Sequence, residues 1–224
     1  MTSQPLLVTV DGPPASGKST AARALARALH VPFLSTGALY RAVAWLAVKR
    51  GVKMTNSGGV ERIARNVKVT FGSSPDGPVR VIVQGREVTD ELQSPEIARI
   101  TSTHVASILG VRAAIVERSR RFFRKPGLVA EGRDCGSVIF PRAPYKFFLT
   151  ASIAARARRR MMDMKQEGIR VSRGRLTADL TRREREERER KVGALAPQPD
   201  AWIVDNTGMD RRETVEIMLR RIRR

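Results

Sequence analysis

The sequence is short of cysteine, aromatic residues and long apolar runs. Only Cys135 of its 224 residues is a cysteine, and 5% of the residues are aromatic. A single cysteine excludes an intrachain disulfide, and the first residues lack the pattern of a secretory signal peptide, so we expect a reducing, cytoplasmic location. No apolar run approaches the ~18–20 residues that a helix needs to cross a bilayer, so we expect no membrane association.

Acidic residues are also in the minority. The chain has 42 Lys and Arg against 22 Asp and Glu, which gives a formal net charge of +20. An excess of this size favours polyanions, nucleotides or an acidic protein as partners, without choosing among them. With 42% hydrophobic residues, the composition is typical of one globular domain covering residues 1–224, and we expect it to act as a monomer.

Five short apolar runs predict the strands of a parallel sheet. They cover residues 6–10, 32–34, 128–130, 145–149 and 201–204. Helical patterns alternate with these runs, which is typical of an α/β fold. The expected helices cover residues 19–29, 40–49, 61–66, 95–123, 153–166, 177–191 and 211–224.

One stretch, residues 67–92, breaks this alternation of strands and helices. Val67, Val69 and Phe71 alternate with polar residues, a Ser-Pro-Gly-rich turn follows at residues 73–78, and valines alternate again after it. Period-two alternation on both sides of a turn predicts antiparallel strands. We therefore expect a small antiparallel insert in the otherwise parallel fold.

Residues 12–19 match the phosphate-loop pattern G-x-x-x-x-G-K-S/T. They leave an apolar strand and enter a helix, so backbone N–H groups and the helix N-terminus can surround phosphate oxygens. Lys18 would reach the β- and γ-phosphates of ATP, and Ser19 would hold Mg²⁺. The residues expected to bind ATP are Gly12, Pro13, Pro14, Ala15, Ser16, Gly17, Lys18, Ser19 and Thr20.

Two further clusters directly follow predicted strands. Thr36 and Arg41 come after the second strand, and Arg133 and Asp134 come after the third. The carboxyl ends of parallel strands form the edge at which open α/β sheets bind ligands. Two arginines at this edge can clamp a second phosphate group, because each guanidinium presents a planar fork to the oxygens. For either arginine alone, an ion pair in an ordinary loop is the alternative interpretation.

A third cluster lies in the charged helix expected at residues 177–191. Arg183, Glu187 and Arg190 are spaced i, i+4 and i+7, so they would share one face of that helix. This face would present two positive groups around a carboxylate, either to a ligand or as a solvated surface of ion pairs. Arginines also crowd residues 156–160 in the preceding helix, which is self-repulsive unless an anion arrives.

Together these motifs resemble those of the bacterial cytidylate kinases, which are P-loop kinases of nucleoside monophosphates. The residues that carry the resemblance are Asp11 to Ser19, Thr36 to Arg41, Glu131 to Pro141, Phe148 to Ser152, and Arg183, Glu184, Glu187 and Arg190. The resemblance covers nearly the whole chain. It implies a P-loop NTPase-type sheet of five parallel strands flanked by helices, with the insert as a monophosphate-side subdomain and a helical lid at residues 156–191.

The resemblance also implies the reaction, which is transfer of the γ-phosphoryl group of ATP to CMP and dCMP. Lys18, Mg²⁺ and the lid arginines Arg156 and Arg160 would oppose charge on the transferred group. Arg41 and Arg133 would hold the acceptor phosphate in line for attack. Because that phosphate is already ionised, no strong general base is needed, and catalysis is mainly positioning and charge neutralisation.

The acceptor base and sugar have their own implied contacts. Asp134 and Arg112 would read cytosine, together with a hydroxyl group from either Ser102 or Thr103. The residues expected to bind the acceptor are Thr36, Arg41, Ser102, Thr103, Arg112, Arg133, Asp134, Arg183, Glu187 and Arg190. The family carries Asp where this chain has Glu187, so the preference between ribose and deoxyribose stays open, as does the use of UMP.

Two other functions compete with this interpretation. One is a P-loop kinase with a different small acceptor, such as another nucleoside monophosphate. The other is a nucleic-acid-binding module that uses the net charge of +20 and the arginine-rich helices. The low aromatic content and the lack of a stacking motif among the basic runs argue against the second, and we expect no nucleic acid partner.

Overall fold

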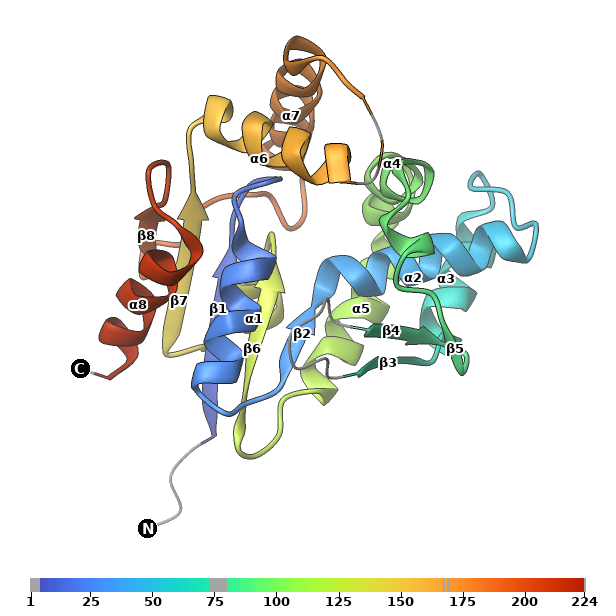
Figure 1. Cartoon of the computed structure of the whole chain (residues 1–224). Helices are drawn as coiled ribbons and strands as arrows, with labels where there is room; N and C mark the ends of the chain where they lie inside the picture. The colour runs from blue at the N-terminus through green and yellow to red at the C-terminus, as the bar shows by residue number, and fades with distance from the viewer. Residues whose placement is uncertain (1–4, 73–79, 167, 169, 224) are drawn as a thin grey trace. The chain divides into compact units, whose positions relative to one another are not determined.

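The computed structural model describes residues 5–72, 80–166, 168 and 170–223. These residues form two compact units, a first unit of residues 1–33 with 123–224 and a second unit of residues 34–122 (Figure 1). No helix among the described residues is both long enough and apolar enough to cross a membrane. The prediction of one domain with an insert at 67–92 and a lid at 156–191 stays a prediction.

The first unit contains most of a five-stranded sheet. Its strands are β1 (Leu6–Asp11), β2 (Phe33–Ser35), β6 (Gly127–Gly132), β7 (Tyr145–Thr150) and β8 (Trp202–Asp205). Their order is β2-β6-β1-β7-β8, and β2 crosses the boundary between the units. The pairs β1–β6, β1–β7 and β7–β8 are parallel. All five predicted strands are found, and the predicted fold class is confirmed.

Two helices cover one face of this sheet, α1 (Lys18–Ala28) and α8 (Arg211–Ile222), as Figure 1 shows. Apolar side chains of both helices pack against the strands, with Leu25 of α1 and Met218 of α8 fully buried. The start of α8 carries a capping box, in which Asp210 and Glu213 each accept a hydrogen bond from the other's backbone N–H. This core fixes the strand ends from which the site residues extend.

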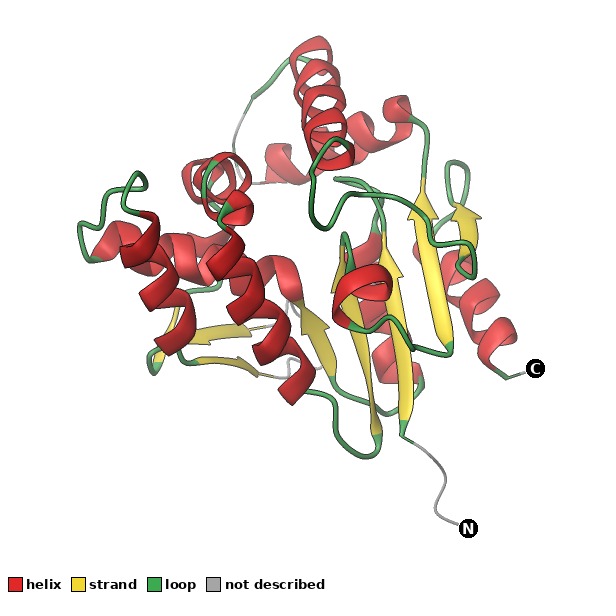
Figure 2. Ribbon diagram, turned by 180° about the vertical axis from the view of Figure 1, so that it is seen from behind, coloured by secondary structure: helices red, strands yellow, loops and turns green. Residues whose placement is uncertain are grey.

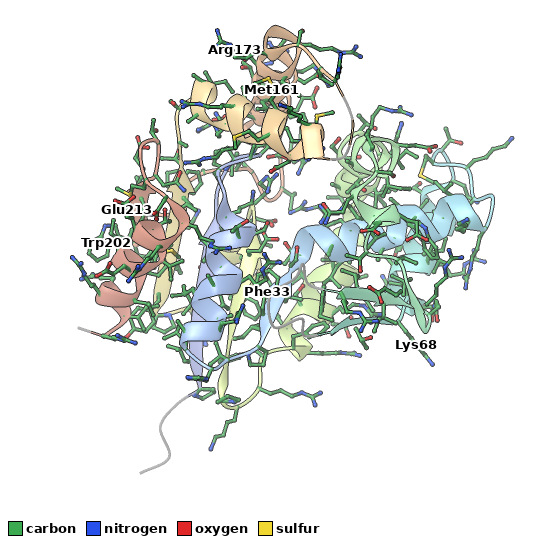
Figure 3. All side chains as sticks on the ribbon, viewed as in Figure 1. Phe33, Lys68, Met161, Arg173, Trp202 and Glu213 are labelled. Atoms are coloured by element: carbon green, nitrogen blue, oxygen red, sulfur yellow. The ribbon has the colours of Figure 1, made fainter. Side chains whose placement is uncertain are left out.

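Two further helices, α6 (Ile153–Gln166) and α7 (Arg173–Arg188), follow β7 in the chain. The arrowheads of the strands point towards these helices (Figure 2). Ala157 and Met164 of α6 pack against Leu176 and Leu180 of α7. Met161, labelled on α6 in Figure 3, lies at the margin of this apolar cluster.

The helix expected at residues 177–191 has different ends. It begins earlier, at Arg173, because the Ser172 side chain accepts a hydrogen bond from the N–H of Arg175 and caps it. It also ends earlier, at Arg188. The prediction that Arg190 shares a helix face with Arg183 and Glu187 is therefore wrong, since Arg190 lies beyond the last turn.

The second unit contains the antiparallel insert. Its strands β3 (Val69–Gly72), β4 (Arg80–Val83) and β5 (Arg86–Glu87) form a three-stranded antiparallel sheet in sequence order. The turn expected at residues 73–78 lies outside the described residues. The helical elements of this unit are α2 (Thr36–Lys49), α3 (Ser57–Asn66), η1 (Glu91–Gln93), α4 (Pro95–Thr103), η2 (Val105–Ser107) and α5 (Leu109–Arg121).

The single helix expected at residues 95–123 is wrong, because α4, η2 and α5 replace it. Near the end of α4, the hydroxyl groups of Ser102 and Thr103 both donate to the carbonyl O of Arg99. The Ser107 hydroxyl donates to the carbonyl O of His104 in the next turn. Side chains that bond to nearby backbone compete with a continuous helix. Ile108 is extended, with φ −74° and ψ 114°, which separates η2 from α5.

We expect Gly12 to tolerate no side chain. An added Cβ there would lie 2.1 Å from the carbonyl O of Leu149, so Gly12→Ala should destabilise the protein by at least ~2 kcal/mol through overpacking. Gly174→Ala on α7 is the matched control, because nothing lies within 4 Å of its added Cβ. This control should be neutral or slightly stabilising. Equal urea midpoints for Gly12→Ala and the wild type would contradict the close approach.

Candidate active site

The phosphate loop joins β1 to α1 at the carboxyl end of the strand. Gly17, with φ 82°, adopts the left-handed backbone conformation that turns the chain into α1. It supplies no capping side chain, and the first turn of α1 contains no acidic residue. The N–H groups and the positive dipole end of α1 can therefore act on an anion in the loop.

Lys18 is held inside this loop. The side chain is buried, and its Nζ donates a hydrogen bond to the carbonyl O of Pro13 at 3.0 Å. Burial and the nearby Arg133 lower the pKa of Lys18 to about 7. An anion at this place would offset both effects, so Lys18 is suited to a phosphate group rather than to a permanent ion pair.

Three arginines belong to the same electrostatic neighbourhood, Arg133 after β6, Arg160 on α6 and Arg183 on α7. Burial, Arg133 and Arg160 together lower the pKa of Arg183, while Glu187 acts in the opposite direction. The Nε atom of Arg183 is buried and has no hydrogen-bond partner among the described residues. Several cations thus share this region, and the Arg183 Nε can donate to a phosphate oxygen, as expected of a phosphate site.

Glu187 is the acidic member of this group. It forms an ion pair with Arg133, whose Nε donates to Oε2 at 2.5 Å. Burial alone would raise the pKa of Glu187, but Arg133 and Lys18 hold it below its usual range. The structure therefore brings together Lys18, Arg133, Arg183 and Glu187, which come from three separate motifs of the sequence.

Arg156, expected to face the transferred phosphate, is held by protein groups. Its guanidinium donates to the carbonyl O of Ala151 at 2.9 Å, to that of Pro14 at 3.3 Å and to Glu184 Oε2 at 2.5 Å. These contacts tie α6 to the phosphate loop and to α7. A contact between Arg156 and phosphate stays a prediction.

Two residues that sequence reasoning missed support the phosphate loop. Asn206, directly after β8, donates from Nδ2 to the carbonyl O of Ser16 at 3.0 Å. Arg159 of α6 donates to the same Ser16 oxygen at 3.3 Å and to Asn206 Oδ1 at 3.0 Å. Asn206 and Ser16 are 190 residues apart in the chain, and no sequence motif joins them. The loop backbone is therefore fixed from two sides.

A cavity of about 370 Å³ opens beside the loop, within the first unit. Its walls come from the phosphate loop, α1, α6, and the start of α8 with the segment before it. They are formed by Ala15, Gly17, Thr20, Ala21, Arg159, Asp163, Asn206, Met209, Asp210, Arg211 and Thr214. A cavity of this size, with both polar and apolar walls, can hold a nucleoside.

Two buried carboxylates lie close to this site, Glu131 on β6 and Asp134 after it. Asp134 was expected at this edge, whereas Glu131 was not assigned a role. The Glu131 charge acts to raise the pKa values of both Lys18 and Arg133. The sequence contained one indication of a role for Glu131, which is its position directly before Gly132-Arg133. A charged residue near the end of a buried strand often belongs to a functional site.

The remaining expected residues belong to the second unit. Thr36 begins α2 and is buried, and Arg41 lies one turn further along. Arg112 of α5 is buried, donates from Nη1 to the carbonyl O of Ala106 at 3.3 Å, and lies 6.0 Å from the Tyr40 ring centroid. Ser102 and Thr103 make equivalent hydrogen bonds to Arg99, so the choice between them stays open.

Comparison with known proteins identifies one family. The sequence profile described as "Cytidylate kinase" matches residues 8–224. The cytidylate kinase of Methylococcus capsulatus is 39% identical over 213 residues, which is 95% of each chain. A bifunctional pantoate ligase/cytidylate kinase of Synechococcus sp. (strain JA-3-3Ab) is 40% identical over 216 residues. The present chain spans 40% of that longer protein.

Solved structures add a likeness of fold. An uncharacterized protein from Eubacterium ventriosum matches with a TM-score of 0.54 and 10% sequence identity. The match covers 97% of the present chain and 98% of the other. At this identity the likeness supports only the shared architecture.

The lowered pKa of Lys18 predicts proton uptake when a polyphosphate binds. An anion restores the ammonium form, so binding above pH 7 should consume a proton, and affinity should fall by up to ~10-fold per pH unit there. Calorimetric titration with tripolyphosphate at pH 8, in buffers of different ionisation enthalpy, measures the uptake. Lys18→Met should lose it, whereas Lys49→Met, on an exposed part of α2, should retain it. Equal proton uptake in the wild type and Lys18→Met would contradict the assignment.

Proposed function

The chain belongs to the cytidylate kinase family, and we propose that it transfers the γ-phosphoryl group of ATP to CMP, giving CDP and ADP. The observation that carries this proposal is the group of Lys18, Arg133 and Arg183 around Glu187, next to an open phosphate loop. Its ammonium and guanidinium groups, among them the Arg183 Nε that has no hydrogen-bond partner among the described residues, are donors from which nucleotide phosphates would accept.

ATP would bind on the phosphate-loop side. The loop and the N-terminus of α1 would surround the β- and γ-phosphates, and Lys18 would contact them as charge moves onto the leaving oxygen. The cavity lined by Arg159 and Asn206 would hold the nucleoside of ATP. Because both side chains are bonded to the loop, donor base and donor phosphates would be positioned by one connected structure.

Magnesium would enter with ATP and be held in part by Ser19. Ser19 is an exposed residue in the first turn of α1, and hydroxyl oxygen is a ligand type that Mg²⁺ accepts. Within the described ranges, no group of three or more His, Cys, Asp or Glu side chains could hold a metal ion. These residues fit an ion held largely by nucleotide phosphates and water. When bound, Mg²⁺ neutralises charge on the β- and γ-phosphates.

CMP would supply the attacking phosphate oxygen. Arg133 and Arg41 would orient this phosphate, and Arg133 already extends from the edge of the sheet that bears the phosphate loop. Phosphate would compete with Glu187 for the Arg133 guanidinium. Because the acceptor oxygen is ionised at neutral pH, the reaction needs alignment and charge neutralisation more than a proton acceptor.

The acceptor base would be read by Asp134, Arg112 and one hydroxyl from Ser102 or Thr103. An ionised carboxylate accepts hydrogen bonds only, so Asp134 suits the amino group of cytosine and disfavours the carbonyl oxygen of uracil. Thr36 would contribute near the acceptor phosphate.

The sugar would lie near Arg183, Glu187 and Arg190, and both CMP and dCMP are proposed acceptors. Burial of Glu187 supports a role in a site rather than on a solvated surface. We further propose that the enzyme acts as a cytoplasmic monomer.

The lid arginines would complete the donor phosphate site. Arg160 is half-buried on α6 and acts electrostatically on Arg183, so an anion between them would relieve repulsion. Arg156 would stabilise the closed arrangement through Glu184 and the carbonyl O of Pro14. Excluding water from the transferred group would limit ATP hydrolysis.

A coupled assay of ADP formation tests the proposed function directly. ATP would be offered with CMP, dCMP, UMP, AMP or GMP at equal concentrations, and CMP or dCMP should give the fastest turnover. Faster turnover with AMP or GMP would establish the rival kinase.

A parallel titration with labelled RNA tests the nucleic-acid rival. It should show weak binding, with an affinity that falls steeply as the salt concentration rises. Tight, sequence-selective RNA binding at physiological salt would support the nucleic-acid rival instead.

Lys18→Ala should fold normally and lose activity. Removing a charge contact made in the transition state should reduce kcat by about 10²–10³-fold. Circular dichroism checks the fold, and Lys49→Ala, which removes an exposed lysine, controls for the change in net charge. Near-normal turnover of folded Lys18→Ala would rule out the phosphate contact.

Asp134→Ala should reduce the preference for CMP over UMP. If Asp134 reads the exocyclic amine, the ratio of kcat/KM values for the two acceptors should shrink by ~1–3 kcal/mol. If Asp134 only positions Arg133, both acceptors should lose activity equally. An unchanged ratio in the variant would show that the base is read elsewhere.

A further inference from the structure

A buried carboxylate that the proposed mechanism does not use joins the phosphate loop to the Arg133 loop. Asp11 is the last residue of β1, directly before Gly12, and is 7% exposed. Its Oδ1 accepts a hydrogen bond from the N–H of Cys135 at 2.9 Å, and its Oδ2 accepts one from the N–H of Gly136 at 2.7 Å. Both carboxylate oxygens are therefore committed to a segment 124 and 125 residues away.

These two N–H groups begin η3 (Cys135–Ile139), a π-helical turn that follows Asp134. The first N–H groups of a helical turn lack partners within the turn and need an acceptor. The residue at its start, Asp134, makes no capping hydrogen bond with its side chain. Asp11 supplies the acceptors from the neighbouring strand, which leaves the Asp134 side chain outside this capping role.

The geometry leaves the loop between β6 and η3 little freedom. Asp11 lies opposite Gly132 in the parallel register of β1 and β6, so only Arg133 and Asp134 separate the strand pairing from the two hydrogen bonds. At Gly136, an added Cβ would lie 2.9 Å from Thr9 Oγ1 and 3.3 Å from Lys146 Cδ. Side chains of β1 and β7 therefore leave no room for a Cβ at this position.

We propose that Asp11 is a positioning residue, whose ionised carboxylate fixes Arg133 and Asp134 relative to the phosphate loop. This inference rests on the proposed function, because it assigns the acceptor to Arg133 and Asp134 and the donor to the loop that begins at Gly12. A single side chain then sets the alignment of the two reacting phosphates. Misplacement by about 1 Å far from the chemistry can cost 10²-fold in rate.

The charge state of Asp11 gives this role a pH dependence. Burial, opposed by the two backbone N–H groups and with a small contribution from Asp134, raises its pKa to about 6. A protonated carboxyl group carries an O–H donor and cannot accept from both N–H groups through ionised oxygens. Turnover should therefore decline as the pH falls through about 6.

Other charged groups lie near Asp11, and their effects on the pH dependence must be distinguished from the effect of Asp11 itself. Lys18 of α1 gains charge as the pH falls, which strengthens phosphate binding and opposes the expected decline. Arg133 keeps its charge throughout, and Lys146 of β7 directs its Nζ to Asp200 and the carbonyl O of Pro141. The remaining contacts are Asp134 and the thiol of Cys135. The acceptor phosphate also titrates near pH 6, so a readout without nucleotide is needed.

Amide NMR of the nucleotide-free protein provides that readout. The amide protons of Cys135 and Gly136 should titrate with a midpoint near pH 6 in the wild type, and this titration should vanish in Asp11→Asn. Asp90→Asn removes an exposed carboxylate in the second unit and should leave the midpoint unchanged. If neither amide proton of the wild type titrated, the proposal would be overturned. This result does not require the variant to fold.

Kinetics separate positioning from a purely structural role. Asp11→Asn should lower kcat for CMP by about 10–100-fold with little change in KM for ATP. The decline of its activity at low pH should differ from that of the wild type.

The stability of the wild type should depend on pH in the direction opposite to turnover. Because the folded-state pKa is raised, the contribution of Asp11 to stability is present below about pH 4 and is lost as the pH rises through about 6.

The outcomes distinguish this inference from the proposed function. If Asp11→Asn retains the kcat and pH profile of the wild type, the positioning role is overturned even if the variant is less stable. If the wild type fails to phosphorylate CMP, the proposed function fails, and the amide titration still decides whether Asp11 anchors the loop.

Discussion

The burial of charged side chains is the constraint on which the rest of the site depends. Burial, and after it the nearby charge of Arg133, makes the charged form of Lys18 costly and lowers its pKa to about 7. At Arg133 burial has the same cost, which nearby carboxylates outweigh. Glu187 offsets part of it through its ion pair with Arg133. An arrangement of this kind is unfavourable for folding alone and becomes favourable when phosphate oxygens arrive, so it marks a place built for a ligand.

The parallel sheet makes this concentration of charge possible. The register of β1 with β6 brings the phosphate loop and the Arg133 loop out of the sheet side by side. Asp11 accepts hydrogen bonds from the N–H groups of Cys135 and Gly136, and Asn206 donates one to the carbonyl O of Ser16, so both side chains hold the backbone of these loops. On α7, Glu184 and Glu187 form ion pairs with Arg156 and Arg133, so these two arginines also anchor α7. The strand register, the hydrogen bonds to the loop backbone and the ion pairs with α7 thus act on the same two loops.

The sequence was informative where a feature is local. Strands, most helices and residues 12–19 were predicted because apolar runs, periodicity and the phosphate-loop pattern are contained in short segments. The break at residues 104–108 and the capped start of α7 were missed, since both involve side-chain bonds to nearby backbone that periodicity does not reveal. The charged run at residues 182–191 contains no apolar pattern that would mark the end of α7 at Arg188. The contacts of Asp11 and Asn206 join residues more than a hundred positions apart, and no periodic pattern encodes such pairs.

The central claim is that the two loops hold two nucleotides with their phosphates in line. Its most direct measurement is calorimetric binding of a bisubstrate analogue, adenosine and cytidine joined through their 5′ positions by five phosphates. If both ends engage at once, the analogue should bind at least ~10²-fold more tightly than ATP or CMP alone, because the second contact becomes intramolecular. An affinity no greater than that of ATP would contradict the account.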